Sequence, residues 1–277
     1  MMRLGSLFAS LMLVASVAWA YDPEKVVVTG HELPPELQDV GVTEKLGGQL
    51  DLSLAFTDEH GETGPLQRFF SKGKPVLMAM VYYSCPSLCN YHLNGLTDAM
   101  KSLKWDAGNE FELVAISMNS TEKPDLAAAK KHNYLKAYGR VDSEKGWHFL
   151  VGSQENVQKI ADQLGFRFKW LEDKQQFAHA SVTYVITPEG KISRYLQGIQ
   201  PDPGTLKLSL LEASGGRIGT VIEQAMLFCF QFNPATNKYT LYAWNLMRIG
   251  AILMVLLLAV LLLPMWRREH MQNRTGI

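Results

Sequence analysis

The stretch Val81–His92, VYYSCPSLCNYH, places two cysteines four positions apart where an apolar run gives way to a polar, helix-compatible one. The preceding run PVLMAMVYY, Pro75–Tyr83, is continuously apolar, which is typical of a central strand covered on both faces. From Leu88 onward the apolar positions recur every three to five residues, as they do in an amphipathic helix. Cys85 and Cys89 therefore lie where a buried strand passes into a helix.

Strands and helices alternate on both sides of this junction. The patterns predict a strand or hairpin at 50–61, a strand at 111–119, a helix from about 125 to 139, a strand at 147–152, a helix at 153–165, a hairpin at 181–198 and a helix from about 206 to 227. Such an order predicts an α/β fold with a mixed sheet flanked by helices.

The two ends of the chain predict export and a membrane anchor. Residues 1–20 combine one positive charge, an apolar core and a small-x-small ending, so we expect a cleaved signal peptide. Residues 249–266 are eighteen residues without a charge, just enough to cross a bilayer, and predict a transmembrane helix. Arginines in the tail, 267–277, place that tail in the cytoplasm by the positive-inside tendency.

The remaining segments follow from these boundaries. We expect an irregular lead-in at 21–48, one folded domain at 49–227 and a linker to the membrane at 228–248. Lysine plus arginine equal aspartate plus glutamate at 27 each, so the overall charge offers no basis for binding nucleic acid. An exported domain on the outer face of a membrane also lies where disulfides persist.

The sequence leaves three uses open for Cys85 and Cys89. Positions i and i+4 share one face of a helix, and a helix N-terminus favours thiolates. A structural disulfide would close a very small loop and gain little stability. A redox dithiol has more support, although the usual redox motif has two intervening residues and this one has three. Two thiolates with a third soft ligand would instead bind a metal such as Cu(I).

The third ligand must come from elsewhere in the chain. His179, in QFAHASVTYVITPEG, immediately precedes the predicted hairpin, from where a loop could reach the helix N-terminus that carries the cysteines. The remaining histidines have weaker claims from their positions: His31, His60, His92, His132, His148 and His270. We interpret Cys229 as a buried thiol among aromatic residues, with pairing to a partner protein as the alternative.

These motifs, in this order, resemble the Sco/SenC family of copper chaperones for cytochrome c oxidase. The resemblance covers roughly Gly48–Gly198 and comprises the apolar strand, the SCPSLC motif and a histidine before a strand–PEG–strand hairpin. It implies a thioredoxin-like fold in which Cys85, Cys89 and His179 bind one copper ion. It also implies that the two cysteines pass between dithiol and disulfide forms.

The resemblance further implies a function in assembly of the copper centre of oxidase subunit II. That function would consist of copper delivery, of reduction of the subunit's cysteines by way of a thiol-reducing partner, or of both. The alternative is a thiol–disulfide oxidoreductase that uses Cys85 and Cys89 without a copper role. A C-terminal anchor, in place of the usual N-terminal one, indicates a bacterial subgroup with one inner-membrane span and a periplasmic domain.

Two positions depart from the pattern of many relatives. This chain has Asn90 where they have a proline directly after the second cysteine, and Ala178 where they have an aspartate directly before the histidine. An acidic neighbour orients an imidazole and raises its basicity. We therefore expect another group to take over that role for His179, or the site to be weaker.

Overall fold

The structure is a computed structural model that describes residues 39–70, 73–85, 88–215, 220, 227, 230–233, 236–241 and 243–272. The predicted signal peptide, most of the predicted lead-in and Cys229 lie outside these residues.

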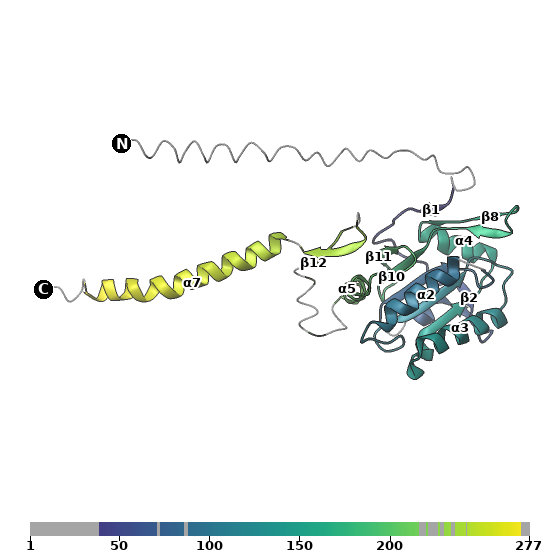
Figure 1. Cartoon of the computed structure of the whole chain (residues 1–277), viewed down its shortest axis with the longest axis horizontal. Coiled ribbons are helices and arrows are strands. Elements are labelled where there is room, and N and C mark those ends of the chain that lie inside the picture. The colour runs from purple at the N-terminus through teal and green to yellow at the C-terminus, as the bar shows by residue number, and fades with distance from the viewer. Residues whose placement is uncertain are drawn as a thin grey trace. The chain divides into compact units, whose positions relative to one another are not determined.

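A five-stranded mixed sheet forms the centre of the described domain (Figure 1), with the strand order β11-β10-β4-β5-β6. Its strands are β4 (Val76–Val81), β5 (Glu112–Ser117), β6 (Trp147–Leu150), β10 (Val182–Ile186) and β11 (Ile192–Gln197). Strands β4, β5 and β6 run parallel, whereas β10 is antiparallel to both β4 and β11. Every residue of β4, β5 and β10 is buried, as expected for strands covered on both faces.

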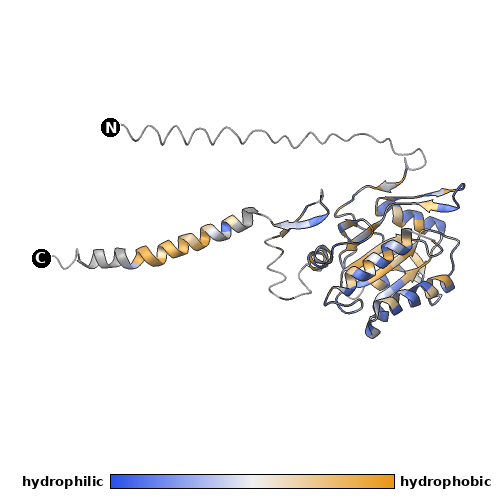
Figure 2. Ribbon diagram, viewed as in Figure 1, coloured by the Kyte–Doolittle hydropathy of each residue, from blue (hydrophilic) through white to orange (hydrophobic). Residues whose placement is uncertain are grey.

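Four helices accompany this sheet in the described part of the domain: α2 (Leu88–Lys101), α3 (Pro124–Tyr138), α4 (Gln154–Gln163) and α5 (Pro203–Ala213). Helix α2 packs against both α3 and α5, α3 packs on β6, and α5 packs on β10 and β11. Figure 2 shows apolar residues concentrated in the central strands and mixed with polar residues along the helices of the domain. Two 3₁₀ turns, η2 (Leu66–Phe69) and η3 (Val141–Gly146), complete the helical elements of the domain.

Local signals explain where several helices begin and end. Helix α4 begins directly after Ser153, whose side chain caps it by accepting a hydrogen bond from the backbone N–H of Asn156. Helix α3 ends at Tyr138, directly before Gly139, whose φ of 74° lies in the left-handed region that glycine adopts readily. Helix α5 begins earlier than expected because Asp202 caps Thr205 N–H, and it ends at Ala213. Most of the helical stretch predicted beyond 215 lies outside the described residues.

Within the described residues, four two-stranded sheets lie outside the central one. They are formed by β1 (Gly41–Val42) with β7 (Phe166–Arg167), β2 (Ala55–Thr57) with β3 (Thr63–Pro65), β8 (Lys169–Leu171) with β9 (Gln176–Ala178), and β12 (Phe230–Asn233) with β13 (Lys238–Leu241). The lead-in predicted as irregular thus contains strand β1, which lies against a segment more than a hundred residues later in the chain. The sequence patterns also missed the β8–β9 hairpin.

Helix α7 (Ala243–Gln272) follows β13 and includes the apolar stretch near the C-terminus. Measured by length together with hydropathy, none of the helices in the described ranges qualifies as a membrane span. The transmembrane helix expected at 249–266 is therefore not confirmed and stays a prediction. By contrast, the predicted α/β domain with a mixed sheet and flanking helices is confirmed.

Candidate functional site

The sheet topology brings the cysteines and His179 to the same end of two adjacent strands. Strand β4 ends at Val81, four residues before Cys85. Strand β10 is antiparallel to β4, with Thr183 opposite Ala79, so the beginning of β10 lies beside the end of β4. The segment that enters β10 carries His179. Antiparallel pairing therefore places the histidine beside the cysteines.

Cys85 and Cys89 are both buried thiols. The backbone N–H of Cys89 donates a hydrogen bond to the sulfur of Cys85 at 3.4 Å, which is the contact expected at the N-terminal turn of a helix. Burial raises the pKa of the Cys89 thiol, and the adjacent Cys85 side chain raises it further. Cys89 therefore holds its proton at neutral pH.

His179 makes the contact with the cysteines. Its Nε2 atom lies 3.1 Å from Sγ of Cys89, and its Nδ1 atom lies 2.9 Å from the backbone carbonyl oxygen of Ala180. A carbonyl only accepts, so Nδ1 carries the ring proton and Nε2 presents its lone pair to the sulfur. Burial lowers the pKa of His179, so the imidazole is neutral at neutral pH. A neutral imidazole nitrogen aimed at a thiol sulfur suits a metal ligand set.

The carbonyl of Ala180 also accounts for one departure from the family pattern. A side chain two positions earlier, at Ala178, has no polar atom that could orient the ring. The backbone supplies the acceptor instead, which sets the tautomer and the direction of Nε2. In this chain the Ala180 carbonyl, rather than an acidic side chain, thus orients the His179 ring.

Aromatic side chains enclose the imidazole. The ring centroids of Tyr82 and Phe166 lie 6.1 Å and 6.2 Å from that of His179. Tyr82 also packs edge-on against Phe177 at 5.3 Å, and burial together with a hydrogen bond to the Cys85 side chain raises its pKa. These rings exclude water from one side of the site, which strengthens its electrostatic interactions.

Glu122 anchors the chain directly before Cys85, and sequence reasoning did not single it out. One carboxylate oxygen accepts from the backbone N–H and the hydroxyl of Ser84, and the other accepts from Tyr83 N–H and the Ser117 hydroxyl. Glu122 follows β5, whose carboxyl end lies beside that of β4 because the two strands are parallel. A glutamate shortly after the next parallel strand was the available signal.

His92 stands beside the site but is engaged with the sheet. It is fully buried, and its Nε2 lies 2.9 Å from the Thr183 hydroxyl. Burial lowers its pKa to about 4, with a smaller contribution from nearby His179. Among the residues that the structure describes, no group of three histidine, cysteine or acidic side chains is already close enough to hold a metal ion. The preformed contact is thus Cys89 with His179, and Cys85 lies one helical turn away.

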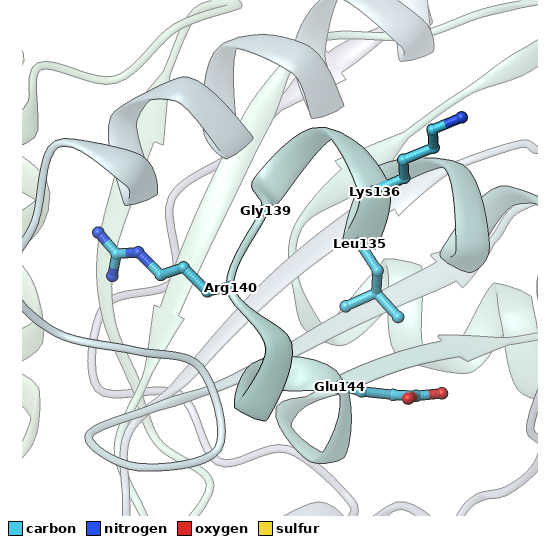
Figure 3. Close-up of a pocket in the computed structure, with 5 residues that line it drawn as sticks. All are labelled: Leu135, Lys136, Gly139, Arg140 and Glu144. Atoms are coloured by element: carbon cyan, nitrogen blue, oxygen red, sulfur yellow. The ribbon is translucent and has the colours of Figure 1, made fainter.

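Three surface cavities among the described residues lie away from the candidate site. One of about 260 Å³, at the C-terminal end of α3 (Figure 3), is lined by Leu135, Lys136, Gly139, Arg140 and Glu144. The Arg140 guanidinium points away from Lys136 in this view and donates to the backbone carbonyls of Lys101, Leu103 and Trp105. None of the predicted site residues lines this cavity.

Comparison with known proteins identifies relatives of the domain that carries the site. The family model described as SCO1/SenC matches residues 44–209. The SCO1 protein homolog of Bacillus subtilis (strain 168) is 24% identical over 154 residues, which cover 54% of this chain and 75% of that protein.

Solved structures with TM-scores above 0.5 share the fold. A putative electron transfer protein from Aquifex aeolicus VF5 is 24% identical with a TM-score of 0.54, and the match covers 62% of this chain and 96% of that one. A copper-bound ScoI from Arabidopsis thaliana is 18% identical with a TM-score of 0.46, over 61% of this chain and 98% of that one.

Proposed function

Because the chain belongs to the SCO1/SenC family, we propose that it is a copper carrier in the assembly of cytochrome c oxidase. Its ligands are the thiolates of Cys85 and Cys89 and the Nε2 atom of His179. The observation that carries this proposal is the 3.1 Å approach of Cys89 Sγ to an Nε2 lone pair, because Nδ1 is already engaged by a carbonyl. The ScoI of Arabidopsis thaliana, solved with copper bound, supports it.

The donor set fits copper as a transferable cargo. Thiolate and imidazole are ligands that Cu(I) prefers, and three of them leave the ion accessible to a competing ligand. The sulfur of Cys85 lies next to the Cys89 amide, so both thiols belong to one helical turn. Delivery would proceed by exchange of these ligands for those of the copper site in oxidase subunit II.

A thiol–disulfide oxidoreductase remains the second candidate, because a thiol within hydrogen-bond reach of an imidazole is also the arrangement of an activated nucleophile. The raised pKa of Cys89 argues against that thiol as the attacking nucleophile. A nucleophile needs a free thiolate, whereas a bound cation replaces the proton and makes burial tolerable. Copper binding therefore explains the buried Cys89 thiol better than a nucleophilic role for Cys89 does.

The location of the protein is a further part of the proposal. We place the domain in the periplasm, with the apolar stretch at 249–266 as a single anchor in the inner membrane and the signal peptide at 1–20 directing export. This placement is supported by the exposed apolar side chains of α7, such as Leu253 at 61% and Leu257 at 61%. Membrane extraction of the full chain, compared with a chain ending at Arg248, tests it.

The test of the copper role is an anaerobic Cu(I) titration of the reduced protein against a competing chelator. The parent is expected to bind one equivalent tightly, and both His179→Ala and Cys85→Ser are expected to lose that binding. His179→Ala should still form the Cys85–Cys89 disulfide. If His179→Ala binds Cu(I) as the parent does, the ligand assignment is wrong; if the parent binds weakly but exchanges disulfides, the oxidoreductase reading is correct.

A further inference from the structure

Asn90 links the cysteine motif to helix α3. Its side-chain Nδ2 donates to the backbone carbonyl of Cys85 at 2.9 Å, and its Oδ1 accepts from Nζ of Lys130 at 2.9 Å. The hydroxyl of Tyr134 lies 3.5 Å from the Asn90 backbone carbonyl. The first cysteine is thereby connected to a helix that lies forty positions beyond Asn90 in the chain.

The Cys85 carbonyl and the Lys130 ammonium together favour an amide side chain at position 90. The Cys85 carbonyl only accepts and the Lys130 ammonium only donates, so the residue between them must donate from one atom and accept with another. A carboxylate would accept from the lysine but could not donate to the carbonyl. A proline has no polar side-chain atom at all. Asn90 meets both requirements in a single orientation of its amide.

The bridge also brings a positive charge to the cysteine motif. Lys130 is half-buried, and its ammonium lies two hydrogen bonds from the Cys85 peptide group. Two thiolates and one Cu(I) ion carry a net negative charge, which a nearby cation offsets. Holding the Cys85 peptide in place further reduces the ordering that ligand binding would otherwise require.

We propose that Asn90 and Lys130 are positioning residues for Cys85 that raise the copper affinity of the site. The proposal rests on the copper function proposed above. Groups that orient a metal ligand without touching the metal typically contribute 10- to 100-fold to affinity, so we expect roughly that loss when either residue is disabled.

The test compares four variants of the reduced full-length protein by anaerobic Cu(I) competition. Asn90→Asp keeps an acceptor for Lys130 but removes the donor to Cys85, and Lys130→Met removes the ammonium. Both are expected to bind Cu(I) roughly 10- to 100-fold more weakly, and the double variant no more weakly than the worse single one. Lys136→Met, on the exposed side of the same helix, is the control and should bind as the parent does.

Two further readouts separate positioning from a merely structural role. Lys130→Arg keeps a donor to Oδ1 of Asn90 and should retain most of the Cu(I) affinity. If Asn90→Asp and Lys130→Met lower the melting temperature but leave the Cu(I) affinity unchanged, the proposal is overturned. If the parent itself binds no Cu(I), the copper function fails. The variants must then shift the equilibrium of the Cys85–Cys89 disulfide with glutathione, and an unshifted equilibrium would overturn the positioning role as well.

Discussion

Sγ of Cys89 lies 3.1 Å from Nε2 of His179, although the two residues are ninety positions apart in the chain. The thiol and the imidazole are both neutral at pH 7, because burial raises the pKa of the first and lowers that of the second. The contact is thus a neutral hydrogen bond that holds both side chains ready, at the edge of the sheet where β4 ends and β10 begins.

Copper affinity should rise with pH. Because the pKa of Cys89 is raised, the thiol still holds its proton at neutral pH and must release it when it becomes a ligand. We expect the apparent Cu(I) affinity to increase about tenfold per pH unit between pH 6.5 and 8 for each proton released. His179 adds no opposing change there, because its lowered pKa keeps it neutral.

The measurement is Cu(I) competition at several pH values with a chelator of known pH dependence. Cys89→Ser serves as the reference, because it removes the displaced proton together with the ligand. An affinity that does not change with pH would show that Cys89 is already a thiolate or does not bind the metal.

His92 makes the fold sensitive to acid. Its pKa is about 4 in the folded protein, below the ordinary value of 6.5, so the unfolded chain binds more protons between these two pH values. The contribution of neutral His92 to the free energy of unfolding is therefore fully present above about pH 6.5 and is lost as the pH decreases toward 4. The full effect on the free energy of unfolding is about 3 kcal/mol.

Urea unfolding at pH 4.5 and at pH 7 measures this effect. His92→Gln should flatten the pH dependence, since its amide can still meet the Thr183 hydroxyl but does not titrate. His60→Gln is the matched control, because His60 has a 68% exposed side chain. Equal pH dependence in the parent and in His92→Gln would contradict the assignment to His92.

Most of the central fold was predictable, because its signals are local. The continuous apolar run before Cys85 and the helical repeat after Cys89 each need only a few neighbouring residues to be recognised, and β4 and α2 occur where they were expected. The β8–β9 hairpin was missed because its strands have three residues each, without an alternating pattern of burial. Strands this short leave no periodicity to detect.

The site was predictable only in part. The sequence indicated His179 as a partner of the cysteines, but the contact depends on β10 pairing with β4, which is a property of the sheet order. Glu122 and Lys130 lie outside the cysteine motif and reach it through hydrogen bonds from other elements. The position of Glu122 shortly after the next parallel strand was a weak signal, whereas no spacing rule connects Lys130 to Cys85.

Glu122 should be essential for stability near the cysteines. Glu122→Ala would leave two backbone amides and two hydroxyls without their acceptor in a buried region. We expect a loss of roughly 2–4 kcal/mol in the free energy of unfolding, because the carboxylate serves several donors at once. Chemical unfolding measures the loss.

Glu155→Ala is the control for this prediction. Glu155 is exposed and pairs with Lys159 along the surface of α4, where ion pairs contribute little. A Glu122→Ala protein as stable as Glu155→Ala would show that water replaces the carboxylate, and the anchoring role would be withdrawn.

The β12–β13 hairpin should loosen when Tyr239 loses its hydroxyl. Tyr239 donates to Glu212, which also pairs with Arg194, and the Arg194 guanidinium lies 5.3 Å from the ring of Phe232. Tyr239→Phe removes one hydrogen bond, worth about 1 kcal/mol, so hairpin amides should exchange about five times faster. Amides of β4 should keep their protection, because the hairpin is outside the central sheet.

Hydrogen exchange followed by mass spectrometry resolves the hairpin from the sheet. Tyr91→Phe is the matched control, because Tyr91 is 62% exposed and its loss should leave hairpin exchange at the parent rate. Faster exchange in both variants would point to a general loss of stability. Unchanged exchange in Tyr239→Phe would mean that the contact of Arg194 with Phe232 and the hydrogen bond from Asn237 to the Gln197 carbonyl hold the hairpin without it.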